Sequence, residues 1–152
     1  MPFLTGSEID FIGKLAFAVC AGFLIGYERE RRGKPAGIST HTLVIAGAMM
    51  FTFFSMQVDP ASKSRIAAQV VSGVGFLGAG MIIKGEDGAV KNLTTAASVW
   101  FAAAIGMGVG FGMYVHAILA TVFAFVVPMI PPVRVFDARA RDAKKQLKRL
   151  TR

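Results

Sequence analysis

The residues that could do chemistry in this chain gather at the ends of its apolar segments. Residues 27–30, Tyr-Glu-Arg-Glu, close the first segment, where a carboxylate opposes the negative end of the helix dipole. Glu28 is explained either by an ion pair with Arg29, Arg32 or a base of another loop, or by a polar vestibule that receives a cation or a partner protein. We group it with polar residues near the second and fourth segments as a candidate rim: Glu28, Arg29, Glu30, Thr40, His41, Asn92, Thr94 and Thr95.

The rim residues of the later segments also have a structural interpretation. Ser39 and Thr40 stand at the start of the second segment, and Asn92, Thr94 and Thr95 stand at the start of the fourth. Serine, threonine and asparagine are the residue types that cap helix N-termini with a side-chain oxygen. We therefore expect these side chains to cap the two helices.

Enzyme, cofactor and metal chemistry are not indicated by the sequence. His41, His116 and Cys20 are expected at different depths of a membrane and do not form a transition-metal site. Residues 73–78 match the dinucleotide fingerprint, but they lie inside an 18-residue apolar stretch with no room for the required parallel sheet. A phosphate-binding loop is also missing from the sequence. We predict a protein that is not an enzyme, with no cofactor, no metal ligand set and no catalytic residue.

The elements that position the rim are long stretches without charge. Residues 92–133 contain no Asp, Glu, Lys or Arg over 42 positions, and the same holds for residues 35–58 and 66–83. A helix needs roughly 18 or more apolar residues to cross the hydrocarbon core of a bilayer. Charged residues make up 17% of the chain, against roughly 25% in soluble domains. The sequence therefore predicts an integral membrane protein.

When the long apolar run is divided at its glycines, the chain has about five segments that could each cross the membrane. We expect an all-α, polytopic bundle with helices near 11–27, 41–58, 66–83, 94–109 and 113–131. The last two share one apolar run, and its alternating glycines at 106–112 weaken a helix and supply a turn or a re-entrant segment. The domain division is a transmembrane region over 1–133 and a basic amphipathic tail over 134–152, suited to an anionic membrane surface or to pairing with its own copy.

Basic residues predict the orientation and argue against nucleic acid. Fourteen of the seventeen Lys and Arg lie in the 28–40 loop, the 84–93 loop or the tail, which five crossings place on one side. The positive-inside rule then places the amino terminus outside and the tail in the cytoplasm, unless 106–112 is re-entrant. Most of the +8 net charge belongs to the tail. We therefore expect the bilayer, and not nucleic acid, as the partner of these charges.

Small and polar residues within the apolar segments predict close helix packing. In a bilayer, helices associate through small residues that let their backbones approach. The same stripes could pack one bundle or join a homo-oligomer, with a dimer favoured: Ala18, Gly22, Gly26, Gly73, Gly75, Gly78 and Gly80. Gln69 and Ser72 are expected to be the most buried polar side chains of the third segment. They could form interhelical hydrogen bonds or line a polar path.

Four blocks of sequence, in order, resemble the MgtC/SapB family of bacterial inner-membrane proteins. They are GFLIGYERE at 22–30, KPAGISTH at 34–41, VSGVGFLGAG at 71–80 and LTTAASVW at 93–100. The resemblance covers roughly residues 15–125. Two positions depart from the family pattern: Ser39 stands where Arg-Thr-His is common, and Asn92 stands where glycine usually precedes Leu-Thr-Thr.

The resemblance implies a membrane protein of about five helices linked to growth at low magnesium and, in pathogens, to survival inside host cells. Family members have been labelled magnesium transport components, while some act by binding other membrane machinery such as the ATP synthase. Larger members carry a soluble carboxy-terminal regulatory domain. This chain resembles the short SapB-like branch, for which regulation through that domain is expected to be absent.

Together these inferences predict a non-enzymatic, multi-pass protein of the bacterial inner membrane that regulates or adapts other membrane machinery in magnesium homeostasis. The expected partners are the lipid bilayer, a second copy of the chain and a membrane protein, with Mg²⁺ as a candidate ligand. The competing hypothesis is an oligomeric channel or carrier for Mg²⁺ or another small solute. Because no acid lies inside the long apolar stretches, a dehydrated Mg²⁺ site within the bilayer is disfavoured. The third hypothesis is a structural membrane protein that binds no ligand.

Overall fold

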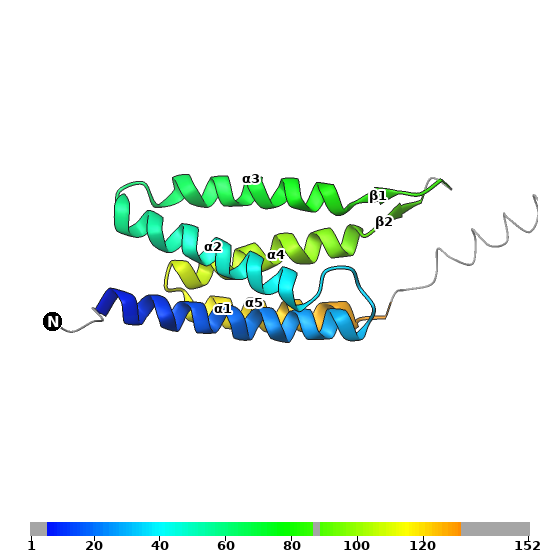
Figure 1. The fold of residues 1–152 in the computed structure, drawn as a ribbon, viewed down its shortest axis with the longest axis horizontal. Helices are drawn as coiled ribbons and strands as arrows, with labels where there is room; N and C mark the ends of the chain where they lie inside the picture. The colour runs from blue at the N-terminus through cyan, green and yellow to red at the C-terminus, as the bar shows by residue number, and fades with distance from the viewer. Residues whose placement is uncertain (1–5, 87–88, 132–152) are drawn as a thin grey trace, which may run out of the picture.

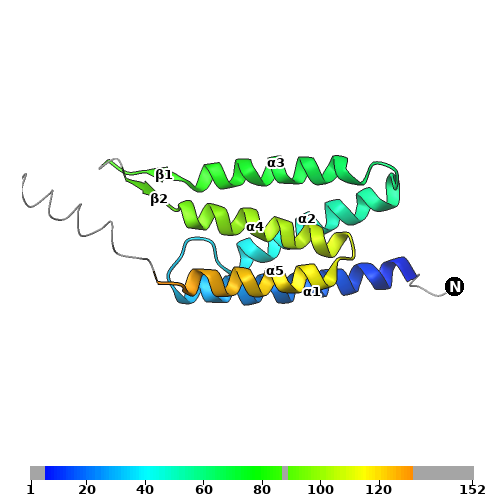
Figure 2. The same cartoon turned by 180° about the vertical axis from the view of Figure 1, so that it is seen from behind.

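The computed structural model describes residues 6–86 and 89–131, and this part of the chain forms five α-helices and one short β hairpin. Successive helices run in alternating directions along one common axis (Figures 1 and 2). The predicted all-α bundle is confirmed, and each expected segment corresponds to one helix. The proposed tail at 134–152 lies outside the described residues. The elements are α1 (Gly6–Arg31), α2 (Ile38–Val58), α3 (Lys63–Met81), β1 (Ile83–Lys84), β2 (Val90–Lys91), α4 (Leu93–Gly110), α5 (Tyr114–Val126) and the 3₁₀ turn η1 (Val127–Met129).

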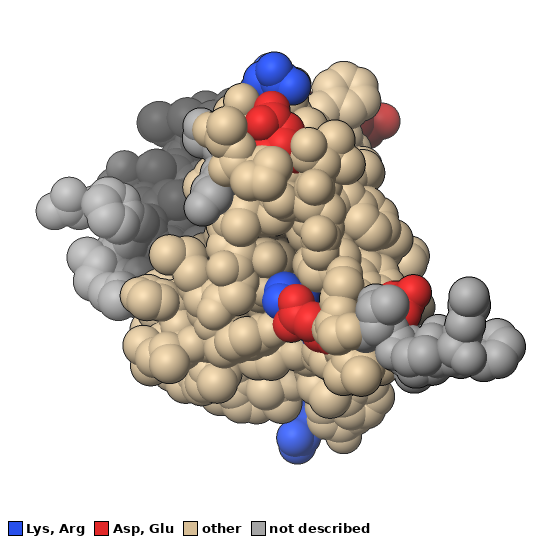
Figure 3. All heavy atoms as spheres, turned by 90° about the vertical axis from the view of Figure 1, so that its left-hand side faces the viewer, with Lys and Arg blue, Asp and Glu red and all other residues tan. Residues whose placement is uncertain are grey.

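Three of these helices, α1, α2 and α4, are long and apolar enough to cross a membrane. They contain 26, 21 and 18 residues, and a helix rises about 1.5 Å per residue. The apolar stretches in α3 and in α5 with η1 are shorter. Figure 3 looks at the end where α1 begins and shows charged atoms only in small spots on a largely uncharged surface. The protein is a membrane protein, and five crossings remain a prediction.

Helix α2 lies at the centre, and glycines bring its neighbours close to it. A Cβ on Gly22 would overlap the backbone of Thr42, and one on Gly26 would overlap the backbone of Ile38. Ala18, on the same stripe of α1, is fully buried. Since Leu-on-Leu burial gains little in lipid, this close backbone contact is the main source of α1–α2 association.

The glycine-rich stretch between α4 and α5 is mostly helical. Gly106 and Gly110 lie one turn apart on α4, and a Cβ on either would collide with α2. Only Gly112, with φ of +77°, takes the backbone conformation that favours glycine in a turn. The alternating pattern therefore serves helix packing first, and the turn occupies just 111–113. Helix α5 then runs back beside α1 (Figure 2).

Helix α3 lies at the edge of the bundle and packs on α2 and α4 with one face. Gly78 is 3.7 Å from the Cβ of Ala96, measured from an ideal Cβ, whereas Gly73, Gly75 and Gly80 face open space. Gln69 and Ser72 are exposed. The expectation that these two are buried is wrong, because hydropathy does not tell which face of an apolar helix meets the protein.

Candidate functional site: the rim

The rim residues, predicted from three separate stretches of sequence, come together at one end of the bundle. The end of α1 and the beginnings of α2 and α4 meet there, beside the β hairpin (Figure 1). These helix ends meet because successive helices are antiparallel, so that every second connection between helices lies at the same end of the bundle. We keep the name rim for the eight predicted residues.

Arg29 is the most deeply buried charge of the rim. Its side chain is 1% exposed, and its Nη2 donates a hydrogen bond of 2.6 Å to the hydroxyl of Thr95 on α4. The Nε atom is buried without a hydrogen-bond acceptor. Among the described residues, no carboxylate lies within ion-pair distance of Arg29. The carboxylate of Glu28 acts on this guanidinium only from beyond ion-pair distance. Burial of Arg29 therefore carries a desolvation penalty of several kcal/mol, and this arginine is unfavourable for stability alone.

Glu28, next to it in sequence, is already neutralised. Its Oε1 accepts a hydrogen bond of 2.9 Å from Nη1 of Arg32, and its side chain is only 6% exposed. The same nitrogen of Arg32 donates to the carbonyl of Pro128 in η1. Of the two explanations for Glu28, the structure contains the ion pair. The pair fastens the end of α1 to the carbonyl end of α5, where a cation is favoured.

Glu30 supplies the cap of α2. Its Oε1 accepts a hydrogen bond of 2.9 Å from the backbone N–H of Ile38, the first residue of the helix. The N-cap position belongs to Gly37, and Ser39 and Thr40 lie inside the first turn. The expected cap by these two hydroxyls is therefore wrong, because a carboxylate from the preceding helix occupies that position.

His41 belongs to a buried polar chain that joins α2, α4 and α1. Its Nδ1 lies 2.9 Å from the carbonyl of Gly37, and its Nε2 lies 3.2 Å from the hydroxyl of Ser98. Because a carbonyl only accepts, Nδ1 carries the proton. The hydroxyl of Ser98 also lies 2.9 Å from the carbonyl of Thr95, the residue that binds Arg29. Ser98 was missed by the sequence analysis, although it lies one turn after Thr94 and Thr95.

Asn92 adopts a left-handed backbone with φ of +64°. Its side chain makes no cap for α4 and instead donates a hydrogen bond of 3.2 Å to the carbonyl of Met81, at the end of α3. The expected cap is therefore wrong here too, and Thr94 is exposed. Glycine adopts this backbone freely and asparagine tolerates it better than most residues. This explains why asparagine can stand where the family pattern has glycine.

A second polar cluster lies toward the opposite end of α1 and was not anticipated. Lys14 is 5% exposed, and its Nζ lies 2.5 and 2.7 Å from the carboxylate oxygens of Asp10. The hydroxyl of Tyr114, on α5, is 3.1 Å from the same nitrogen. The ammonium also lies 5.6 Å from the ring centre of Phe53. Lys14 is thus fully compensated and joins α1 to α5.

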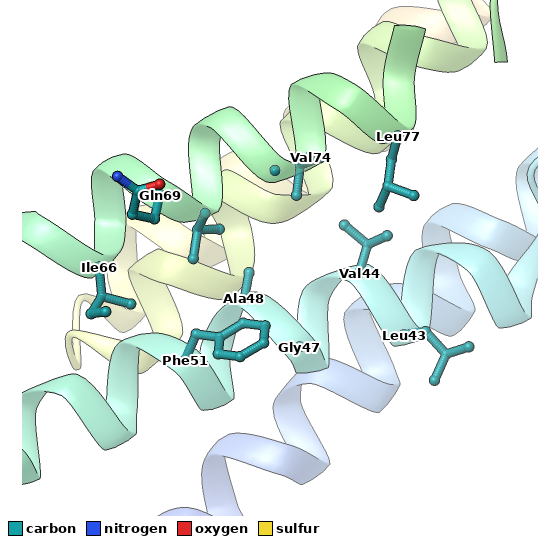
Figure 4. Close-up of a pocket in the computed structure, with 11 residues that line it drawn as sticks. Leu43, Val44, Gly47, Ala48, Phe51, Ile66, Gln69, Val74 and Leu77 are labelled. Atoms are coloured by element: carbon teal, nitrogen blue, oxygen red, sulfur yellow. The ribbon is translucent and has the colours of Figure 1, made fainter. Parts of the chain in front are cut away.

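The polar path proposed through Gln69 and Ser72 has no enclosed counterpart near them. A groove of about 520 Å³ separates α2 from α3, and Gln69 is the sole polar side chain among its lining residues (Figure 4). His116 and Cys20 are both exposed. Within the ranges 6–86 and 89–131, no three His, Cys, Asp or Glu side chains come together in a way that could hold a metal ion.

Comparison with known proteins gives one consistent result. Residues 15–133 match the family model described as MgtC family. Protein MgtC of Brucella abortus (strain 2308) is 47% identical over 129 residues, covering 83% of this chain and 54% of the relative. Protein MgtC of Salmonella typhimurium (strain LT2) is 46% identical over 112 residues, covering 74% and 48% respectively. The chain spans about half the length of the curated relatives it matches. No solved structure matches it.

Proposed function

Because the chain belongs to the MgtC family, we propose that it is a non-enzymatic regulator or adaptor of other membrane machinery in magnesium homeostasis, acting through the rim. The observation that carries this proposal is the convergence of α1, α2 and α4 on a polar cluster at one end, next to exposed groups such as Thr94. A docking surface needs exposed polar groups on a rigid base, and this arrangement supplies both.

The competing function is an oligomeric channel or carrier for Mg²⁺ or another small solute. The groove between α2 and α3 gives this hypothesis little support, because it is lined almost entirely by apolar side chains (Figure 4). Mg²⁺ gives up its bound water reluctantly and prefers oxygen ligands such as carboxylates. The rim carboxylates are engaged by Arg32 and by the α2 N-terminus. We therefore favour the adaptor.

We place the protein in the bacterial inner membrane as a multi-pass protein with the rim in the cytoplasm. The described basic residues support this orientation, since Arg31, Lys34, Lys84 and Lys91 belong to the rim end of the bundle, whereas Arg65 belongs to the other. Labelling of single cysteines introduced at Lys34 and at Val58 in intact cells tests it. A reagent that cannot cross the membrane should reach position 58 and not position 34.

We propose a homodimer that uses the outer face of α3. Gly75 and Gly80 leave room there for a second helix, and the exposed Ser72 would gain a hydrogen-bond partner in the low-dielectric bilayer. Gly73 and Gln69 line the groove toward α2 instead. The mass of the purified protein in detergent should correspond to two copies. Gly75→Leu should reduce it to one copy, whereas Val115→Leu, on exposed α5, should not.

The test of the adaptor hypothesis combines growth with transport. Thr94→Trp enlarges an exposed rim residue, and Val115→Trp does the same on α5 as a control. In a strain that lacks the native protein and grows poorly at low Mg²⁺, the control should restore growth and the rim variant should not. Proteoliposomes of both should show no Mg²⁺ entry above empty vesicles. Entry of Mg²⁺ that Glu28→Gln abolishes would refute the adaptor and establish the transporter.

A further inference from the structure

The first turn of α4 has free hydrogen-bond donors on its outer side. The N–H groups of Leu93, Thr94 and Thr95 have no acceptor in the described part of the chain, and the helix has no side-chain cap. The left-handed Asn92 followed by helical Leu93 is a backbone pattern that turns successive N–H groups toward one concavity. Leu93 is 61% exposed and Thr94 is exposed, whereas Thr95 is buried, so the turn is open to the surroundings at its first two residues.

A buried positive charge lies directly behind this turn. Arg29 points its guanidinium at α4, where Nη2 contacts the hydroxyl of Thr95, and its Nε has no acceptor. A helix N-terminus already favours negative charge through its dipole. The buried guanidinium adds a full charge in a low-dielectric setting, where it acts more strongly than in water.

The acids nearby do not supply the missing negative charge. Glu28 is paired with Arg32, and Glu30 is bound to the N-terminus of α2. Glu86 lies on the exposed hairpin and makes no ion pair in the described structure. Exposed bases at this end, Arg31 and Lys34, raise the positive potential further. The local charge balance therefore calls for an external anion.

We propose that the first turn of α4 binds a phosphate group, with the backbone N–H groups as donors and Arg29 as the charge behind them. Phosphate offers several acceptor oxygens at once and is the anion that helix N-termini and arginine bind most readily. The source is either the headgroup of an anionic phospholipid or free inorganic phosphate. The exposed Leu93 and Trp100 on α4 would contact the acyl chains of a lipid. This site does not depend on the adaptor role.

Trp100 is the single tryptophan of the chain and lies two turns from the site, so its fluorescence reports binding. The full chain, purified in phosphate-free dodecyl maltoside, is titrated separately with inorganic phosphate, with short-chain phosphatidylglycerol and with a short-chain diacylglycerol. Saturable binding of either phosphate compound, without binding of the diacylglycerol, is the expected result. Binding of phosphatidylglycerol alone identifies the lipid as the source, and binding of both identifies the free anion as sufficient.

Two arginines at the same end of α1 provide the matched variants. Arg29→Met should weaken binding by about tenfold or more, as expected for loss of a full charge close to the anion in a low-dielectric setting. Arg31→Met, at an exposed position, should change it by less than about twofold. Arg29→Lys keeps the charge and should retain binding, which separates charge from misfolding. Absence of saturable binding to either compound, or equal loss in the Arg29 and Arg31 variants, would overturn the proposal.

Discussion

Lys14 and Arg29 are both basic, both on α1 and both buried, yet they are compensated in opposite ways. Lys14 has a carboxylate one turn earlier on its own helix and a tyrosine hydroxyl from α5. Arg29 has one neutral hydroxyl from α4 and an unpartnered Nε. The first cluster is a closed, nearly neutral joint between helices. The second keeps its charge, and this difference is our reason for proposing that function lies at the rim rather than at the Lys14 end.

The largest effect is expected at the closed cluster. Asp10→Ala leaves the buried Lys14 with only the hydroxyl of Tyr114. The Asp10 carboxylate is itself 46% exposed, so the cost should be about 2.5 kcal/mol, below the range for a fully buried pair. Unfolding by dodecyl sulfate in mixed micelles measures the loss. Asp59→Ala removes the carboxylate of an exposed pair with Arg65 and should cost less than about 0.5 kcal/mol. If both variants lost the same free energy of unfolding, Lys14 would be hydrated and would not differ from an exposed ion pair.

The next effect tests whether Glu28 can compensate Arg29. Arg32→Ala strands the buried Glu28 and the carbonyl of Pro128, at an expected cost of about 2 kcal/mol. Adding Glu28→Gln should recover most of that loss, because the stranded charge is gone. Should Arg32→Ala cost less than about 0.5 kcal/mol by the same measurement, Glu28 can turn to Arg29, and the two clusters would be alike.

A smaller effect is expected when Arg29 loses its single acceptor. Thr95→Val keeps the shape of the side chain and removes the hydroxyl, which should cost about 1 kcal/mol. Thr94→Val is the control one residue earlier, at an exposed position, and should be nearly neutral. Identical stabilities for both variants would show that the contact between Arg29 and Thr95 contributes nothing.

The smallest effect is expected at Arg29 itself. Arg29→Met fills a similar volume and strands no carboxylate, so stability without phosphate should stay within about 0.5 kcal/mol of the native chain. Thermal unfolding in neutral detergent, in parallel with Asp10→Ala, provides the measurement. A loss as large as that of Asp10→Ala would make Arg29 a structural residue and remove the difference between the two clusters.

Much of the fold follows from the sequence for simple physical reasons. Uncharged stretches long enough for a bilayer predicted α2 to α5, and an apolar segment interrupted only by Lys14 predicted α1. The spacing of Ala18, Gly22 and Gly26 predicted the stripe that lies against α2. The meeting of the rim residues also followed, because antiparallel helices return alternate turns to one end. These features depend on one segment at a time, or on the count of segments.

What the sequence could not predict depends on contacts between distant segments. The pairing of Lys14 with Tyr114 joins residues one hundred positions apart. Which face of α3 meets the protein could not be inferred from Gln69 and Ser72, because polar side chains in an apolar helix can face either the protein or the outside. Both cap predictions failed for the same reason: Glu30 reaches α2 from another helix, and the side chain of Asn92 is drawn to the end of α3.

The cap that Glu30 provides has a consequence for the order of assembly. Together with the close contacts of Gly22 and Gly26, it joins α1 and α2 near the loop that connects them. Such a pair can form as soon as both helices have entered the bilayer, because little chain entropy opposes it. The acceptor of Arg29 and the Ser98 partner of His41 Nε2 arrive only with α4, some sixty residues later. The charged centre of the rim is therefore completed only after the hairpin of α1 and α2 has formed.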